Sequence, residues 1–431
     1  MADQVAAALD RALALDANDP MGRFRARFYL PDERIYLDGN SLGLLSRDAE
    51  AEIGRVVEQW KTLGIAGWLE ADPPWFTLGE ELGAAMAPLM GAEPAAVVVT
   101  GSTTVNLHAL AATFYRPEGG RRRIVATALD FPSDIYAMAS QIALHGGDPA
   151  RDLVLVPSRD GRTIAEQDII AALDDTVAMA LLPVVMYRSG QMLDVGRLAA
   201  EGRERGIVMG FDAAHSAGSV PHLLDDWGVD FAVWCTYKHL NAGPGAIGAL
   251  YVNRRHWGAA PSLAGWWGYD KDRQFDMAFD WRGGEGAGAW QISTPSLLSA
   301  APLRASLAMV KEAGGIGAVR TRSLALTDFL IETMERAGLT GPDYGFSIGT
   351  PLAHGQRGGH VAIEHQDADR VAKALKARGV IPDFRKPNVI RLAPVALYNS
   401  FADIAQSVGH LRGIIDGGEH LALQAGRERV A

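Results

Sequence analysis

The chain has 431 residues, of which 48% are hydrophobic and 21% charged, and its formal net charge is −10. This acidic balance argues against a surface that binds nucleic acid, and the length suffices for one large and one small domain. No apolar run reaches the roughly 18 residues of a membrane-spanning helix, and the acidic start lacks the pattern of a secretory signal. The single cysteine, Cys235, permits no intrachain disulfide, so we expect a cytoplasmic protein.

Helical spacing and a glycine-rich loop mark the first part of the chain. Apolar residues at intervals of three and four predict helices over residues 3–16 and 46–63. Between them an extended segment, 34–38, leads into the loop Gly39-Asn40-Ser41-Leu42-Gly43.

From residue 95 onward, apolar strands alternate with helices of about 10–15 residues, a rhythm that predicts a largely parallel sheet covered on both faces. The expected strands cover residues 95–100, 124–128, 153–157, 177–185, 207–211, 231–236 and 246–252. One expected helix ends at residue 115, and the others cover 133–145, 165–174 and 195–205.

The pattern changes after residue 300, where a mixture of helices and shorter strands indicates a small α+β domain. Helices are expected at 302–313, 316–337, 367–377 and 401–415, and strands at 345–348, 359–364 and 389–393. We therefore predict an α/β fold in which residues 51–305 form a large domain with a mostly parallel, seven-stranded sheet. Residues 1–50 are expected to join residues 306–431 in the small domain.

Two ionisable residues stand at the ends of apolar strands. Asp212 follows Ile207–Phe211, and Lys238 follows Phe231–Thr236 and precedes a small-residue loop, 240–245. Pyridoxal phosphate (PLP) requires a carboxylate that keeps its ring nitrogen protonated and an amine that bonds its aldehyde. A surface lysine and a turn-capping aspartate are the structural alternatives, but a buried aspartate needs a cationic partner, which the PLP ring supplies. We predict a PLP enzyme that acts on an amino acid.

A phosphate site is expected at the turn after the first expected strand, residues 95–100. Gly101-Ser102-Thr103-Thr104-Val105-Asn106 places hydroxyls and free N–H groups at the positive end of a helix dipole, although an ordinary N-cap is the alternative. After the next strand, Phe131-Pro132-Ser133-Asp134 offers an aromatic ring to stack on the pyridine and a carboxylate to contact a ligand. Its alternative is a plain helix start.

Further features lie close to these residues in the sequence. His215 could orient Asp212 or contact the cofactor, and its alternative is a satisfied core histidine. Tyr237 could bind phosphate or relay protons rather than pack in the core. The paired indoles of Gly265-Trp266-Trp267-Gly268-Tyr269 suggest a donor that reaches a ligand, or interface packing. Cys235 is expected to be a buried, inert thiol, and no metal site is predicted.

Strings of residues along most of the chain resemble the kynureninase family of fold-type-I PLP enzymes. They are Tyr36-Leu37-Asp38-Gly39-Asn40-Ser41-Leu42-Gly43, Thr104-Val105-Asn106-Leu107-His108, Phe131-Pro132-Ser133-Asp134, Asp212-Ala213-Ala214-His215, Trp227-Gly228-Val229-Asp230-Phe231, Trp234-Cys235-Thr236-Tyr237-Lys238-His239-Leu240-Asn241, Gly265-Trp266-Trp267-Gly268, Ile292-Ser293-Thr294-Pro295 and Arg391-Leu392-Ala393-Pro394-Val395-Ala396-Leu397-Tyr398-Asn399-Ser400-Phe401. The strings vary in specificity individually, but their order together is highly specific.

The resemblance implies a role for each residue of the site. Lys238, Tyr237 and Asp212 would be catalytic: Lys238 bonds the cofactor and Asp212 binds its ring nitrogen. The cofactor would also contact Thr103, Thr104, Phe131, Ser133, Asp134, His215, Tyr237, Trp266 and Thr294. Trp266 and Thr294 would come from the second subunit of a homodimer. The substrate would contact Arg391, Ser41, Trp68 and Tyr269, and a guanidinium such as that of Arg391 suits the substrate α-carboxylate.

Four positions bear on how closely the chain follows the family pattern. Tyr269 stands where the family commonly has histidine, and Pro183 replaces a hydroxyl residue that often lines the phosphate site. Trp68 stands where the animal enzymes have histidine, and Thr294 where they have asparagine. The last pair resembles the bacterial type of pocket, which takes kynurenine rather than 3-hydroxykynurenine.

The implied activity is hydrolysis of the Cβ–Cγ bond of L-kynurenine to anthranilate and L-alanine, a step of tryptophan catabolism that also leads toward NAD. The partners expected are this small amino acid and a second copy of the chain, with no nucleic acid and no membrane. One alternative is a ring-hydroxylated or methylated kynurenine in a biosynthetic pathway. Another is a cysteine desulfurase or amino-acid lyase, although a desulfurase needs a mobile cysteine. A third is a binding protein that has lost catalysis, against which Lys238, Asp212 and Arg391 argue.

Overall fold

The computed structural model describes residues 2–31, 34–424 and 426; residues 1, 32–33, 425 and 427–431 of the predicted small domain lie outside this set. Its largest sheet within these residues has seven strands in the order β2-β8-β7-β6-β5-β3-β4. The strands are Val97–Val99 (β2), Arg123–Thr127 (β3), Leu153–Val156 (β4), Val177–Pro183 (β5), Val208–Asp212 (β6), Phe231–Cys235 (β7) and Gly248–Val252 (β8). Strands β3 to β7 are parallel, whereas β8 is antiparallel to both β7 and β2. The predicted fold class is therefore confirmed.

Alternate residues of the central strands face two separate hydrophobic cores. In β7, Phe231 and Val233 belong to the core beneath α5 (Thr103–Phe114) and α6 (Pro132–Leu144). Ala232 and Trp234 belong to the core on the other face. That face is covered by α4 (Leu78–Met90), α8 (Glu166–Ala172), α9 (Val195–Glu204) and α11 (Leu297–Glu312). Burial on both faces explains why these strands are continuous apolar runs.

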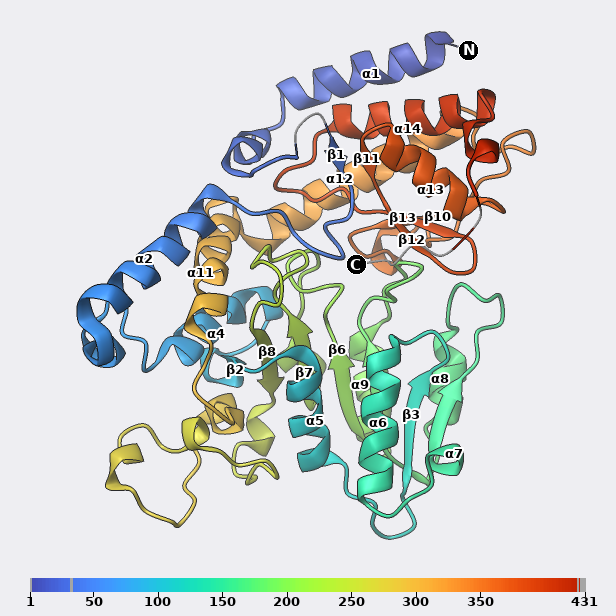
Figure 1. Ribbon diagram of the computed structural model, residues 1–431. Helices are drawn as coiled ribbons and strands as arrows, with labels where there is room; N and C mark the ends of the chain where they lie inside the picture. Colours follow the sequence, from blue (N-terminus) through green and yellow to red (C-terminus); the bar gives the residue numbers. More distant parts are fainter. Residues whose placement is uncertain (1, 32–33, 425, 427–431) are drawn as a thin grey trace.

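The C-terminal part of the chain forms a second, smaller sheet, which lies above the carboxyl ends of the central strands (Figure 1). Its antiparallel order is β12-β13-β10-β9. These strands are Ser347–Ile348 (β9), Val361–Glu364 (β10), Asp383–Arg385 (β12) and Val389–Leu392 (β13), with α12 (Gly315–Arg336), α13 (Ala368–Ala377) and α14 (Phe401–Asp416) beside them. Helix α1 (Ala2–Ala17) runs along α14, and β1 (Ile35–Tyr36) pairs with β11 (Val380–Ile381). The exact domain division remains a prediction.

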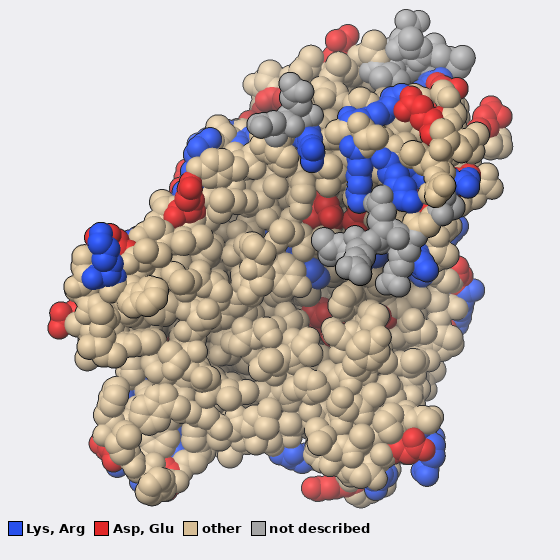
Figure 2. All heavy atoms as spheres, in the orientation of Figure 1, with Lys and Arg blue, Asp and Glu red and all other residues tan. Residues whose placement is uncertain are grey.

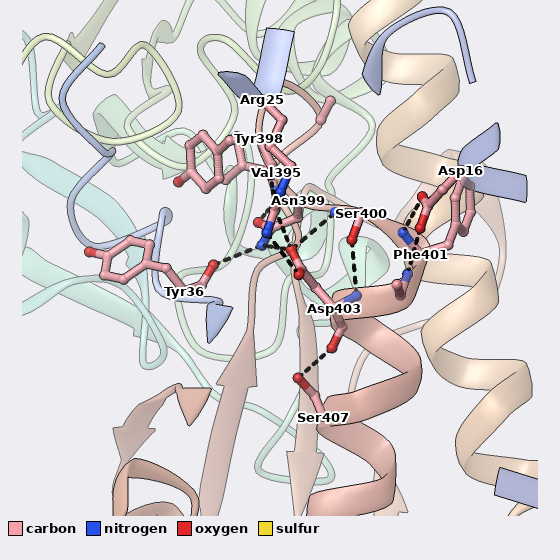
Figure 3. A network of polar contacts seen from close by, with 12 residues as sticks. Asp16, Arg25, Tyr36, Val395, Tyr398, Asn399, Ser400, Phe401, Asp403 and Ser407 are labelled. Carbon is pink, nitrogen blue, oxygen red and sulfur yellow. Dashed lines mark hydrogen bonds and ion pairs between the residues drawn. The ribbon is translucent and has the colours of Figure 1, made fainter. Parts of the chain in front are cut away.

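A polar network holds the N-terminal segment onto the start of α14 (Figure 3). The carboxylate of Asp16 accepts hydrogen bonds from the backbone N–H groups of Phe401 and Ala402, at 2.8 and 2.9 Å. Arg25 pairs with Asp403 at 2.6 Å, and Asp403 also forms a capping box with Ser400. Both carboxylates lie at the helix N-terminus, where a negative charge is favourable.

The expected helices and strands match the structure closely, with a few differences. Helix α11 begins at Leu297 rather than at residue 302, and Pro302 is accommodated inside it. Helix α2 (Arg47–Leu63) matches its prediction, whereas α4 and the short strands β11 and β12 were not predicted. Among the described residues, no helix is both long and apolar enough to cross a membrane.

Candidate active site

A cavity of about 540 Å³ opens where the carboxyl ends of β5, β6 and β7 meet the N-terminal loop and the smaller sheet. Ligands commonly bind outside the carboxyl ends of strands in open α/β sheets. The residues that line this cavity, which we call the Lys238 cavity, are Asn40, Ser41, Thr103, Thr104, Leu129, Asp130, Phe131, Ser133, Asp134, Pro183, Val185, Tyr187, Asp212, Ala214, His215, Cys235, Tyr237, Lys238, Arg385 and Arg391.

Lys238 lies three residues beyond the end of β7 and projects into the cavity toward a histidine. Its Nζ lies 2.8 Å from Nε2 of His215. Burial, and then the nearby charge of Lys238, lower the pKa of His215 well below its usual range, so the imidazole is neutral. Its Nδ1 is buried without a hydrogen-bond partner among the described residues. A neutral ring with one unsatisfied nitrogen can still contact a ligand.

Asp212 ends β6 and is part of a group of three buried carboxyl side chains. Its Oδ1 accepts a hydrogen bond of 2.7 Å from the N–H of Ala214. Burial raises the pKa of Asp212, and the charge of Lys238 opposes this shift. Burial and the neighbouring Asp212 raise the pKa of Asp134 well above its usual range, so Asp134 keeps its proton and donates to Asp212. Burial raises the pKa of Asp130 to about 7.

The residues predicted to bind phosphate lie at the start of helix α5. Thr103 and Thr104 are the first residues of this 12-residue helix, and both line the cavity. The free N–H groups and the positive dipole end at such a position favour a phosphate. Ser133 lines the same cavity from the start of α6, while Pro183, at the end of β5, offers no donor there.

Arg391 reaches the cavity from β13 and is held by contacts on several sides. Its guanidinium is fully buried and pairs with the buried carboxylate of Asp383, which also accepts from Arg385 at 2.8 Å. Nη1 of Arg391 donates to the carbonyl of Tyr187 at 2.6 Å, and Nη2 donates to Oγ of Ser41 at 3.0 Å. This rigid, cationic group is suited to a carboxylate ligand.

The glycine-rich loop of residues 39–43 is pressed against the Lys238 segment. A Cβ at Gly43 would lie 2.2 Å from Oδ1 of Asn241 and 2.5 Å from the carbonyl oxygen of Lys238, so only glycine fits. This approach brings Asn40 to the cavity wall. Asn40 is fully buried, and neither its Oδ1 nor its Nδ2 has a hydrogen-bond partner among the described residues.

Phe131 and Tyr237 both line the cavity. The ring of Phe131 is 43% exposed and meets Tyr187 edge to face, with centroids 5.3 Å apart. Burial, followed by the neighbouring thiol of Cys235, raises the pKa of the Tyr237 hydroxyl, so it carries a proton. Cys235 is buried, as predicted, and burial raises the pKa of its thiol.

Four predicted ligand residues lie outside the Lys238 cavity. Trp68 and Thr294 line a second hollow of about 470 Å³, together with apolar residues of α2 and α11. Trp266 and Tyr269 line a third, smaller hollow of about 160 Å³, where Trp266 is 44% exposed and Tyr269 is buried against Trp281. Within one subunit these residues do not join the other predicted site residues.

Several residues of the cavity were not predicted as site residues. Asn40 sits beside the predicted Ser41, so the glycine-rich loop was the signal for both. Asp130 precedes the Phe131 string directly. Tyr187, in the loop after β5, and Arg385, in β12, carry no local signal; Arg385 reaches the cavity only because the smaller sheet packs there.

These groups together match what PLP requires. A buried carboxylate at the end of β6, an amine just after β7 and a helix start with hydroxyls fit its ring nitrogen, aldehyde and phosphate. Solved structures with the same fold include a cysteine desulfurase from Thermococcus onnurineus, with a TM-score of 0.77 and 18% identity over 92% of this chain and 98% of that one. A C-DES variant with glycine linked to its PLP cofactor gives a TM-score of 0.76 and 18% identity over 90% and 98%. Fold and site therefore define a fold-type-I, PLP-dependent enzyme.

Sequence relatives narrow this class to one family. A kynureninase of Geobacillus thermodenitrificans is 51% identical over 98% of both chains, and one of Bacillus anthracis is 52% identical over 97% of both. The kynureninase C-terminal domain model matches residues 319–411. The chain belongs to the kynureninase family, and the predicted resemblance is confirmed.

Proposed function

We propose that the protein hydrolyses L-kynurenine to anthranilate and L-alanine. The observation that carries this proposal is the full-length identity of about 51% to curated kynureninases, joined to a cavity that contains a lysine, a buried aspartate and an arginine. The cysteine desulfurase alternative shares only the fold at 18% identity, and the single cysteine here is buried in β7. Nothing favours a modified kynurenine as the substrate.

When bound, PLP supplies an electron sink that stabilises negative charge at the substrate Cα. We assign its attachment to Lys238 and its ring nitrogen to Asp212, which Asp134 supports through the hydrogen bond between the two carboxyl groups. Thr103, Thr104, Ser133 and Tyr237 would hold the phosphate, while Phe131 would cover the ring and His215 would contact its oxygen. Lys238 Nζ would then take the proton from Cα.

Tyr237 is our candidate for the donor of the last proton in the reaction. Water adds to the γ-carbonyl, and cleavage of the Cβ–Cγ bond leaves an electron pair on Cβ that needs a proton. The Tyr237 hydroxyl holds its proton and lines the cavity. Tyr237→Phe should lower kcat by about 100-fold, and full turnover by this variant would remove the role.

Arg391 and Ser41 are assigned to the substrate α-carboxylate. Support comes from the buried guanidinium at the cavity wall and its 3.0 Å contact with Ser41. We assign Trp68 and Tyr269 of a second subunit to the aryl group of the substrate. Trp266 and Thr294 of the same second subunit are assigned to the cofactor.

A homodimer with shared sites is part of the proposal. Figure 2 shows Lys, Arg, Asp and Glu along the edges of one face, while the centre of that face carries few charges. Large exposed hydrophobic side chains include Trp60, Ile65, Phe275 and Phe279. Exposed apolar surface of this kind marks an association site. We further propose a cytoplasmic role in tryptophan catabolism, without nucleic-acid or membrane partners.

The proposal is tested by the release of anthranilate from L-kynurenine and of 3-hydroxyanthranilate from 3-hydroxy-L-kynurenine, with PLP-loaded enzyme. Faster turnover of kynurenine is expected, because the residue types at positions 68 and 294, Trp68 and Thr294, resemble those of the bacterial type of pocket. Preference for the hydroxylated substrate would leave the chemistry in place and overturn the pocket assignment. Turnover of neither substrate would contradict the proposed activity.

Lys238→Ala tests whether Lys238 attaches the cofactor and transfers the proton. It should remove the visible absorption of the bound cofactor and lower turnover by more than about 1,000-fold, because both attachment and proton transfer use Nζ. The control is Lys373→Ala on α13, whose amine bonds backbone carbonyls near the end of the described chain. It should keep both the absorption and the rate.

A further inference from the structure

The carboxylate subsite around Arg391 contains an aspartate that none of the assignments above uses. Asp38 follows β1, and its backbone bridges to Ala393, two residues beyond Arg391. Its side chain accepts a hydrogen bond from the hydroxyl of Ser41. Its Oδ1 is shielded from solvent and has no partner among the described residues.

Ser41 links this aspartate to the substrate arginine. Oγ of Ser41 accepts from Nη2 of Arg391 at 3.0 Å, and its single proton is donated to Asp38. While Asp38 is ionised, the Ser41 proton is directed away from the cavity. A neutral Asp38 would release that proton for a carboxylate bound beside Arg391.

The charges around Asp38 come from every element packed against it. β12 contributes Asp383 and Arg385, β13 contributes Arg391, β1 contributes Tyr36, and the loop before α14 contributes Tyr398. Burial raises the pKa of both tyrosines, which are therefore neutral. Two guanidinium groups against the one carboxylate of Asp383 leave one unit of positive charge, enough for one further anion.

We propose that Asp38 and the substrate α-carboxylate compete for this single positive charge, so that the substrate binds together with one proton taken up by Asp38. The inference rests on the proposed function, because it takes Arg391 as the carboxylate site. Asp38 does not line the cavity and acts through Ser41 and Arg391, so it is a positioning residue. Burial, and then the charge of Asp383, raise the pKa of Asp38 to about 6, which places the competition near neutral pH.

The test uses 4-oxo-4-phenylbutanoate, which keeps the carboxylate and aryl ketone of the substrate but has no amino group to titrate. Its dissociation constant for the PLP-loaded enzyme should rise by about 50-fold between pH 6 and pH 8, because a site with a pKa near 6 must first be protonated. Calorimetry in two buffers with different ionisation enthalpies should show uptake of close to one proton at pH 7.5.

Asp38→Asn should bind the probe with an affinity that changes less than about twofold across this range and without proton uptake. Asp38→Ser should behave in the same way, and cofactor absorption with an unfolding midpoint at pH 6 no lower than that of wild type shows that each variant is folded. Asp152→Asn is the control. Its buried carboxylate lies on α7 (Pro149–Asp152) and accepts from the N–H of Asp148, away from the cavity, so it should keep the wild-type profile.

The outcomes separate this inference from the proposed function. Binding that weakens with pH equally in wild type and Asp38→Asn, or that proceeds without proton uptake in both, overturns the role of Asp38 alone. Absence of binding to wild type at every pH overturns the carboxylate subsite itself, and the role of Asp38 with it. Asp130, whose pKa burial raises to about 7, lies beside Asp212 and is intact in Asp38→Asn, so a pH dependence caused by Asp130 would persist in that variant.

Discussion

Burial sets the protonation of the residues around Lys238. His215 is neutral because removal from water penalises its cation. Asp134 keeps its proton because burial disfavours its anion and because Asp212 lies beside it. The result is a cavity in which the charge of Lys238 favours the ionised form of Asp212. A cationic cofactor ring would relieve the cost of burying that charge.

Asn40 offers a donor and an acceptor that no group within the described part of the chain satisfies, so we expect it to bind the substrate. Asn40→Ala should raise KM for L-kynurenine by about tenfold with kcat nearly unchanged, as expected for a hydrogen bond present throughout the reaction. Steady-state kinetics measure this. Asn253→Ala is the control, because its amide bonds Val229 and Tyr251 outside the cavity and should affect stability alone. An unchanged KM for Asn40→Ala would show that the amide does not contact the substrate.

Asp38 should also make stability depend on pH. Folding raises its pKa from 3.8 to about 6, so the ionised carboxylate lowers stability above pH 6, and this cost disappears below pH 4. Asp38→Asn should therefore be more stable than wild type at pH 8 by roughly 3 kcal/mol, with the difference shrinking toward pH 4. Urea unfolding at both pH values measures this. Equal midpoints at pH 8 would mean that folding does not disfavour the charge.

At the scale of elements, hydrogen bonds and an ion pair at the first turn of α14 hold the N-terminal segment in place. Its first turn receives Asp16 from α1 and the Arg25–Asp403 pair, so the cap joins parts of the chain almost 400 residues apart (Figure 3). The capping box of Ser400 and Asp403 is local and readable from the sequence. The contribution of Asp16 depends on tertiary packing.

Asp403→Ala should destabilise the protein by about 3 kcal/mol, because it removes a cap and leaves the part-buried Arg25 without its carboxylate. The midpoint of urea unfolding, followed by circular dichroism, reports the change. Asp416→Ala, at the exposed end of the same helix, is the control and should cost about 0.5 kcal/mol or less. Equal effects of the two substitutions would show that the network adds nothing to stability.

Strand positions were predictable because β5, β6 and β7 are buried on both faces and bounded by small or polar residues. The antiparallel direction of β8 was not, since side-chain periodicity is the same in either direction. Helix α4 contains Gly79, Gly83 and Pro88, which lower helix propensity, and packing against β2 compensates.

For the whole molecule, the positions of the predicted site residues divide into two groups. Most of them line the Lys238 cavity, whereas Trp68, Thr294, Trp266 and Tyr269 lie in separate hollows. A second subunit that presents its hollows to the first cavity would unite the groups. That arrangement would also cover the exposed hydrophobic side chains of residues 60–69 and 275–279.

Shared sites predict that two defective variants complement each other. Lys238→Ala and Trp266→Ala should each be poorly active, and mixtures refolded together should recover about a quarter of the wild-type rate, because half of the random dimers carry one intact site. Anthranilate release by the mixture measures this. Rates equal to the mean of the two variants would place Lys238 and Trp266 in the same subunit or in no common site.

The sequence by itself determined the alternation of strands and helices, the candidate lysine and aspartate and the family, because buried strands and short motifs are encoded locally. Tertiary structure alone decided that Asp383, Arg385 and Tyr187 surround Arg391, and that Asp38 faces the same charge. These contacts join residues as far as 350 positions apart. Protonation likewise depends on burial and on neighbouring charges, which arise only when the smaller sheet and the N-terminal loop close over the ends of the central strands.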